Sequence, residues 1–105
     1  MQTINIAAIP NQSFSIQLES NFYFIELKEA NGAMVISITR NSILLIENMI
    51  CVIGTPLIPY EYLEDGNFFF TTDAVNSVPY YTAFGITQFL FYITQAEIAS
   101  LRAGM

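Results

Sequence analysis

The sequence of 105 residues contains no histidine, one cysteine (Cys51) and three basic side chains, Lys28, Arg40 and Arg102. Without imidazole, neither a Cys–His pair nor a Ser–His pair can form, and one cysteine cannot build a zinc site or an internal disulfide. Three scattered cations cannot form the basic surface that a phosphate backbone requires, and the net charge is −6. These absences argue against an enzyme, against a metal or cofactor, and against specific nucleic-acid binding.

Carboxylates are the chemical groups that are left, and they are concentrated in one stretch. Glu61, Glu64 and Asp65 lie together, and Asp73 follows a few residues later. A calcium loop needs oxygen ligands in an ordered series, and only Asp65-Gly66-Asn67 hints at one, in the wrong register. A hydrolase would need two close carboxylates in a cleft, one of them with a raised pKa. We interpret the stretch as a solvated acidic loop.

Apolar side chains dominate what is present: the hydrophobic fraction is 53%, with nine Phe and six Tyr, whereas charged residues make up 11%. Globular domains ordinarily contain about a quarter charged residues, and a chain of this size hides only about two-thirds of its unfolded surface. Apolar surface is therefore left over for a membrane, a partner protein or further copies of the chain. We expect it to be buried between proteins in an assembly.

Two observations argue against a membrane. The longest uncharged stretch, residues 74–96, is interrupted by Pro79, Gly85 and several amide and hydroxyl side chains, which a lipid-facing helix does not tolerate. Residues 1–10 contain no basic segment followed by an apolar core, so no signal peptide is expected. We predict a protein that is synthesised in a cytoplasm, is not inserted in a membrane, and has a buried structural thiol at Cys51.

Alternation of apolar and polar residues predicts a meander of antiparallel strands over residues 13–18, 23–27 and 34–38. Polar segments separate these strands, and the Asn31-Gly32 pair favours a tight turn because both residues tolerate positive φ.

The next part of the chain is apolar without alternation. Residues 43–46 and 49–53 are continuous apolar runs, typical of a strand covered on both faces, with Glu47-Asn48 as a turn or bulge between them. Two prolines in residues 54–60 prevent central-strand pairing and predict an extended crossover along the edge of the domain. Further strands are expected at residues 68–72 and 86–94, the second closing the sheet, with a loop over 73–82 between them.

The C-terminal residues change to a helical pattern. Thr94 and Glu97 have the spacing of a capping box, Arg102 suits the last turn, and Gly104 can end the helix. We therefore predict a single all-β domain over residues 1–105, a small antiparallel β-barrel or sandwich with a short C-terminal helix at residues 94–103.

A series of motifs follows in order along residues 11–94: Asn11-Gln12-Ser13-Phe14 with the strand to Leu18, Tyr23-Phe24-Ile25-Glu26-Leu27, the strand Met34 to Ile38, the crossover Ile53-Gly54-Thr55-Pro56-Leu57-Ile58-Pro59, Phe68 to Asp73, and Phe84-Gly85-Ile86-Thr87 with Leu90-Phe91-Tyr92-Ile93. The order and spacing of these motifs resemble the small baseplate plug protein family of contractile-tailed bacteriophages.

This resemblance implies a structural virion component of the tail baseplate, at the junction of tube and hub, that helps to close the tail channel before DNA ejection. Its partners would be tail tube, hub and spike proteins, and its copies would form a symmetric oligomer. The residues expected at interfaces are Pro56, Leu57, Ile58, Pro59, Phe84, Phe89, Phe91, Ile98 and Leu101. An acidic surface facing the channel would let DNA slide without sticking, and the residues expected there are Glu61, Glu64, Asp65 and Asp73.

The alternative is a small β-barrel module that binds an apolar ligand or peptide. An empty interior lined by Phe and Tyr would favour this module, whereas a filled core would favour an assembly component.

Overall fold

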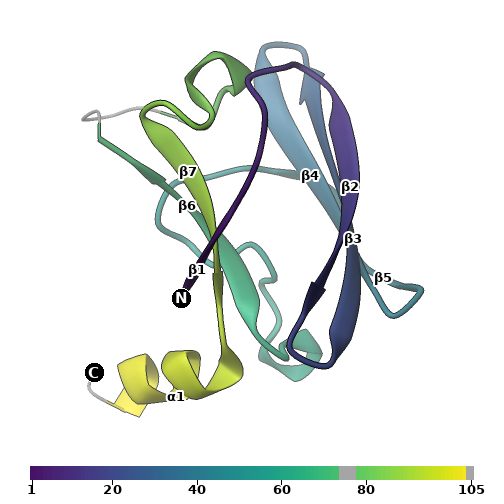
Figure 1. Cartoon of the computed structure of the whole chain (residues 1–105), viewed down its shortest axis with the longest axis vertical. Coiled ribbons are helices and arrows are strands. Elements are labelled where there is room, and N and C mark those ends of the chain that lie inside the picture. The colour runs from purple at the N-terminus through teal and green to yellow at the C-terminus, as the bar shows by residue number, and fades with distance from the viewer. Residues whose placement is uncertain (74–77, 104–105) are drawn as a thin grey trace.

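The computed structural model describes residues 1–73 and 78–103 as two antiparallel sheets that face one another, with a helix at one end (Figure 1). The four-stranded sheet has the order β2-β3-β4-β5, formed by β2 (Gln12–Leu18), β3 (Asn21–Ala30), β4 (Ala33–Arg40) and β5 (Ile43–Ile50). The three-stranded sheet has the order β1-β7-β6, formed by β1 (Gln2–Ile4), β7 (Gln88–Ile93) and β6 (Asn67–Thr72). Single 3₁₀ turns occupy Glu61–Leu63 and Tyr81–Ala83, and the helix is α1 (Gln95–Ala103). Because neither sheet closes on itself, the predicted all-β fold is a sandwich and not a barrel.

The predicted meander is confirmed in strands β2 to β4, and β5 extends it by one more antiparallel strand. The β3–β4 hairpin turns at Asn31 and Gly32, with φ values of 52° and 83°, and the β4–β5 hairpin turns at Asn41 and Ser42, with φ values of 50° and 69°. Positive φ at both central residues matches the twist of the flanking strands, which explains the preference for Asn and Gly here.

The core fills the space between the two sheets. Tyr23 from the four-stranded sheet meets Phe68 from the three-stranded sheet edge to face, with ring centroids 5.2 Å apart. The side chains that are fully buried with them include Ile25, Leu27, Met34, Ile36, Ile38, Phe70, Phe84, Leu90 and Tyr92. Burying each large apolar side chain stabilises the fold by about 1.5–3 kcal/mol, so this layer is the main source of cohesion between the sheets.

Strand β5 differs from its prediction. The first apolar run and the start of the second form one strand that ends at Ile50, and Glu47-Asn48 is a bulge at which Asn48 adopts a φ of 48°. The strand lies at the edge of the sheet, and Ile43 and Ile50 are 66% and 62% exposed. The expectation that both faces are covered is therefore wrong within this chain, because no layer of the described fold lies over them. Cys51, just after β5, is buried as predicted.

The three-stranded sheet contains a strand that the sequence pattern does not predict. Residues 2–4 form β1, which pairs with β7 in a register that joins Thr3 to Phe91. Strand β7 is therefore the central strand of its sheet, with β1 and β6 on its two sides, rather than the strand that closes it.

The crossover and the helix follow their predictions. The chain after β5 runs along the outer edge of β6, where Gly54 N donates to Phe70 O and Leu57 N donates to Phe68 O, both at 2.8 Å. Helix α1 begins after Thr94, and no helix in the described parts of the chain is long and apolar enough to cross a lipid bilayer. Residues 74–77 of the predicted loop, and Gly104, lie outside the described residues.

Candidate functional site

The nine residues predicted at interfaces divide into two groups in the structure. Leu57, Ile58 and Phe84 are at most 2% exposed and belong to the core, where the Phe84 ring stacks on Phe70. Ile98 is also buried, on the side of α1 that faces the sheets. The other five residues have solvent-accessible side chains that a partner could contact. Pro56, Pro59 and Leu101 are exposed, and Phe89 and Phe91 are half-buried.

Two of these predicted residues, Phe89 and Phe91, lie with Phe69 on the outward face of the three-stranded sheet, and two others border this face. Phe69 pairs with Phe91 across β6 and β7, and their rings stack with centroids 5.7 Å apart. Phe89 lies two residues before Phe91 on β7, so it projects from the same face. Pro56 borders this face from the crossover, and Leu101 borders it from α1.

A hollow of about 550 Å³, which we call the outer groove, lies between this face, the crossover and α1. Its lining consists of Met1, Gly54, Pro56, Asn67, Phe69, Ile93, Ile98, Leu101 and Arg102. The lining is almost wholly apolar, so the groove can bind an apolar side chain or segment but has no group suited to acid–base chemistry.

Asn67 fixes the crossover side of the groove. Its side chain is fully buried, and its Oδ1 accepts hydrogen bonds from Ile58 N at 2.9 Å and Phe68 N at 2.8 Å. Its Nδ2 donates to Ile58 O at 2.9 Å and to the Glu64 carboxylate. One amide therefore satisfies both backbone groups of Ile58, which could not pair with a strand because Pro56 and Pro59 interrupt the ladder.

Helix α1 forms the other side of the groove and is held at both ends. At its start, Thr94 N donates to Glu97 Oε1 at 3.0 Å and Glu97 N donates to Thr94 Oγ1 at 3.2 Å, which is the predicted capping box. The N-terminal ammonium of Met1 donates to Glu97 Oε2 at 2.6 Å, and this bond together with that from Thr94 N lowers the pKa of Glu97 to about 2.

The far end of α1 is joined to the turn before β6. Arg102 donates from Nη1 to Glu64 Oε1 at 2.7 Å and from Nη2 to Glu64 Oε2 at 3.1 Å. The Glu64 side chain is 1% exposed. Burial alone would raise its pKa, but the hydrogen bonds from Arg102 and Asn67 outweigh burial and lower the pKa of Glu64.

The four acidic residues predicted to face a channel do not form one cluster. Glu64 is enclosed by its partners, and Asp65 accepts a hydrogen bond from Asn21 Nδ2 at 2.9 Å. Asp65 precedes β6 and Asp73 follows it, so the six-residue strand separates the two carboxylates by about 20 Å. Glu61, Asp65 and Asp73 are exposed. Within the described ranges, no group of three or more Cys, Asp or Glu side chains could hold a metal ion.

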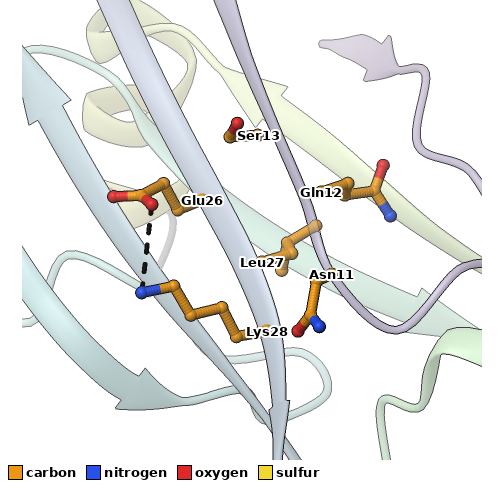
Figure 2. A pocket seen from close by; sticks show the side chains of 6 residues that line it. All are labelled: Asn11, Gln12, Ser13, Glu26, Leu27 and Lys28. Atoms are coloured by element: carbon orange, nitrogen blue, oxygen red, sulfur yellow. Dashed lines mark ion pairs between the residues drawn. The ribbon is translucent and has the colours of Figure 1, made fainter.

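A second, smaller hollow of about 200 Å³ is polar and lies beside β2 and β3 (Figure 2). Its lining residues are Asn11, Gln12, Ser13, Glu26, Leu27 and Lys28. Lys28 and Glu26 approach to 3.9 Å on the exposed face of β3, which is a weak surface ion pair. Gln12 is already bonded to the backbone of Ala7 through both side-chain atoms, so this hollow contains neither a nucleophile–base pair nor two facing carboxylates.

Six of the nine residues that line the outer groove were not among the predicted interface residues: Met1, Gly54, Asn67, Phe69, Ile93 and Arg102. In the sequence, Asn67 was considered only within the acidic stretch Asp65-Gly66-Asn67, and Phe69 only within the strand expected at residues 68–72. Met1 joins the groove because β1 pairs with β7. The run Phe68-Phe69-Phe70 was the one available signal for Phe69, since apolar residues on both faces of a strand favour a covering layer on both faces.

Comparison with known proteins agrees with the resemblance seen in the sequence. No curated protein matches the chain. A family model described as "Cyanophage baseplate Pam3 plug gp18" matches residues 1–96, which include both sheets and the start of α1. The chain belongs to this family of phage baseplate plug proteins.

Proposed function

We propose that the chain is a structural subunit at the junction of the tail tube and the hub, where it contributes to the plug that closes the tail channel before DNA ejection. A baseplate plug family implies a place in the virion tail and contact with other baseplate proteins. The finer assignment to tube, hub and spike partners of a contractile tail is part of the proposal.

The outer groove carries this proposal. A groove of about 550 Å³ with a nearly continuous apolar lining is costly to leave in water, and it is shaped to receive a side chain or segment of a neighbouring protein. Leu101 is 62% exposed at its rim, although its helix is anchored at both ends. A rigid rim with an exposed apolar residue is the arrangement expected of a preformed docking site.

The acidic residues support a place beside DNA. The chain has a net charge of −6, and Glu61, Asp65 and Asp73 are exposed. Facing the channel, these carboxylates would repel the phosphate backbone and keep DNA from adhering. A reconstruction of the tail in which all three face away from the channel would contradict this part of the proposal.

The docking site is tested by exchanging one exposed apolar residue at the groove for a carboxylate. In Leu101→Glu, binding to the purified hub and tube proteins should weaken by about tenfold or more, because a charge would be buried without a partner. Ile86→Glu is the matched control, since Ile86 is equally exposed (66%) but precedes β7, at the opposite end of that strand from α1. Equal binding by both variants and the unaltered chain would overturn the assignment of the groove.

The alternative of a barrel with an internal ligand receives less support. The sheets are open, and the space between them is occupied by Tyr23, Phe68, Phe70 and their neighbours, all fully buried. Following the criterion set by the sequence, a filled core favours an assembly component.

A further inference from the structure

The four-stranded sheet ends in two strands that each have one neighbour. Strand β2 pairs with β3 on one side and β5 pairs with β4 on the other, and along residues 1–73 and 78–103 no strand pairs with the far side of either. By contrast, the crossover covers the outer edge of β6. Unpaired backbone groups along an edge are a template for another strand, so natural proteins usually protect them with charges or prolines.

Strand β2 has none of the usual protection of an edge strand, and β5 has only one charge and a bulge. Strand β2 contains no charged residue, and β5 contains one, Glu47 at the bulge. Ile43, Leu44 and Ile50 of β5 are 66%, 51% and 62% exposed. In a chain with a net charge of −6, these two edges are places where another acidic chain could approach with little repulsion.

The directions of the strands determine how a second copy fits. All three neighbouring pairs in the sheet are antiparallel, so β2 and β5 run in opposite directions. A second copy added in the same orientation therefore presents its β2 antiparallel to β5, and the alternation continues across the boundary. The outward faces also continue, because one row of paired residues runs from Ser15 through Phe24 and Thr39 to Leu44.

We propose that copies of this chain associate head to tail, with β5 of one copy pairing antiparallel with β2 of the next to form one continuous sheet. This inference rests on the proposed function as a baseplate subunit and on the symmetric oligomer that the family resemblance implies, and it names the surfaces that would join the copies. Pairing two β5 strands about a twofold axis fits less well than head-to-tail pairing. It would bring two Glu47 carboxylates into one interface, and it would leave the backbone groups along the outer edge of β2 without a partner strand. Head-to-tail contacts use both edges and close into a ring when the rotation permits.

Single-cysteine variants test this pairing directly. Leu44→Cys places a thiol on the exposed face of β5, and Ser13→Cys, Ser15→Cys and Gln17→Cys place one at each exposed position along the same face of β2. The native Cys51 is buried and stays in place. Leu44→Cys is mixed with each β2 variant, oxidised gently, and analysed without reductant, so the three mixtures sample three registers.

The expected result is a reducible band at twice the 11.8 kDa chain mass in at least one mixture of Leu44→Cys with a β2 variant. Leu44→Cys alone should give no more of this band than its mixture with Ser100→Cys, the control on the exposed side of α1. Efficient cross-linking of Leu44→Cys alone would show twofold pairing of β5 and overturn the head-to-tail assignment. A wild-type chain that sediments as a monomer at all concentrations, with no cross-link in any mixture, would overturn it as well.

Adding Leu101→Glu to the cross-linking variants separates this inference from the proposed function. Head-to-tail pairing should be unaffected by that change, because the outer groove belongs to the other sheet. Cross-linking that persists without hub binding would refute only the role of the groove. Hub binding without cross-linking would refute only the pairing of copies.

Discussion

Replacing Asn67 with alanine should destabilise the protein more than its size suggests. The side chain is completely buried and bonds both backbone groups of Ile58, the N–H at 2.9 Å and the carbonyl at 2.9 Å. In Asn67→Ala these two groups lose their partners in a segment whose prolines prevent strand pairing. The crossover that forms one side of the outer groove would then be held by its hydrogen bonds to β6 and by the burial of Leu57 and Ile58 in the core.

The magnitude follows from the number of groups left unpaired. Each buried polar group without a partner costs about 1–3 kcal/mol, so the two groups of Ile58 alone predict a loss of about 4 kcal/mol, and Phe68 N, which also donates to Asn67 Oδ1, adds to it. A domain of this size has a total stability of about 5–15 kcal/mol, and 1 kcal/mol corresponds to about 4–8 °C in Tm. We therefore expect Tm to fall by about 15–30 °C.

Denaturant unfolding followed by circular dichroism measures this loss, with Asn5→Ala as the control because Asn5 is exposed. The control should change the free energy of unfolding by no more than about 0.5 kcal/mol. A second variant, Asn67→Asp, keeps the acceptor but turns an oxygen toward Ile58 O and the Glu64 carboxylate. The difference in the free energy of unfolding between Asn67→Asp and wild type should become smaller as the pH falls, because a protonated Asp side chain regains a hydrogen-bond donor. A loss below about 1 kcal/mol in Asn67→Ala would refute the reasoning.

Three further outcomes can be measured on the same chain. Gly66→Ala should lower stability by about 2–4 kcal/mol, because Gly66 has a φ of 89° and a Cβ at this position would overlap the Tyr92 ring. Gly32→Ala is the control: Gly32 has a φ of 83° but faces open space, so the loss of stability should be about 1 kcal/mol. Equal losses of stability in the two variants would contradict the close packing of Gly66 against Tyr92. Glu64→Gln should lower stability by about 1–2 kcal/mol at pH 7. The pKa of Glu64 is lower in the folded state than in the unfolded state, so its contribution to stability is present above the unfolded pKa of about 4.3 and is lost as the pH falls through the folded pKa. The free energies of unfolding of wild type and variant, measured as a function of pH, should therefore become equal in acid. A difference that stays constant with pH would contradict this role of Glu64. Burial raises the pKa of Cys51 to about 12, so its thiol should react slowly in the folded protein. Alkylation followed by mass spectrometry should be at least about 100-fold slower in the native protein than after unfolding. Comparable rates of alkylation in the two states would contradict the burial of Cys51.

Local chemistry was enough to predict the meander, the crossover and the helix, but not β1. Alternation over residues 13–38 predicted the meander, because a strand between core and solvent must alternate. Asn31-Gly32 predicted the type of turn, and the prolines at 56 and 59 predicted a crossover outside the ladder. Thr94 and Glu97 predicted the start of α1, since a capping box involves only residues three apart.

The candidate docking face was only partly accessible from the sequence. Pro56 and Leu101 were predicted as interface residues, but nothing in their spacing indicated that they would line one groove together with Phe69. Leu57 and Ile58 looked equally suitable, and the structure places both in the core. Apolar character predicts burial, but it does not say whether the covering surface comes from the same chain.

The sequence by itself determined the class of fold, the local turns and caps, and the absence of histidine and of clustered basic residues. Only the tertiary structure decided which apolar residues stay exposed, as at Ile43 and Ile50, and which carboxylate is enclosed, as at Glu64. It also decided that β1 joins β7 and that Asp73 lies a strand's length from Asp65. The physical reason is that periodicity and capping depend on neighbours within a few residues. Burial, ion pairing and the pairing of distant strands depend instead on which segments meet in space.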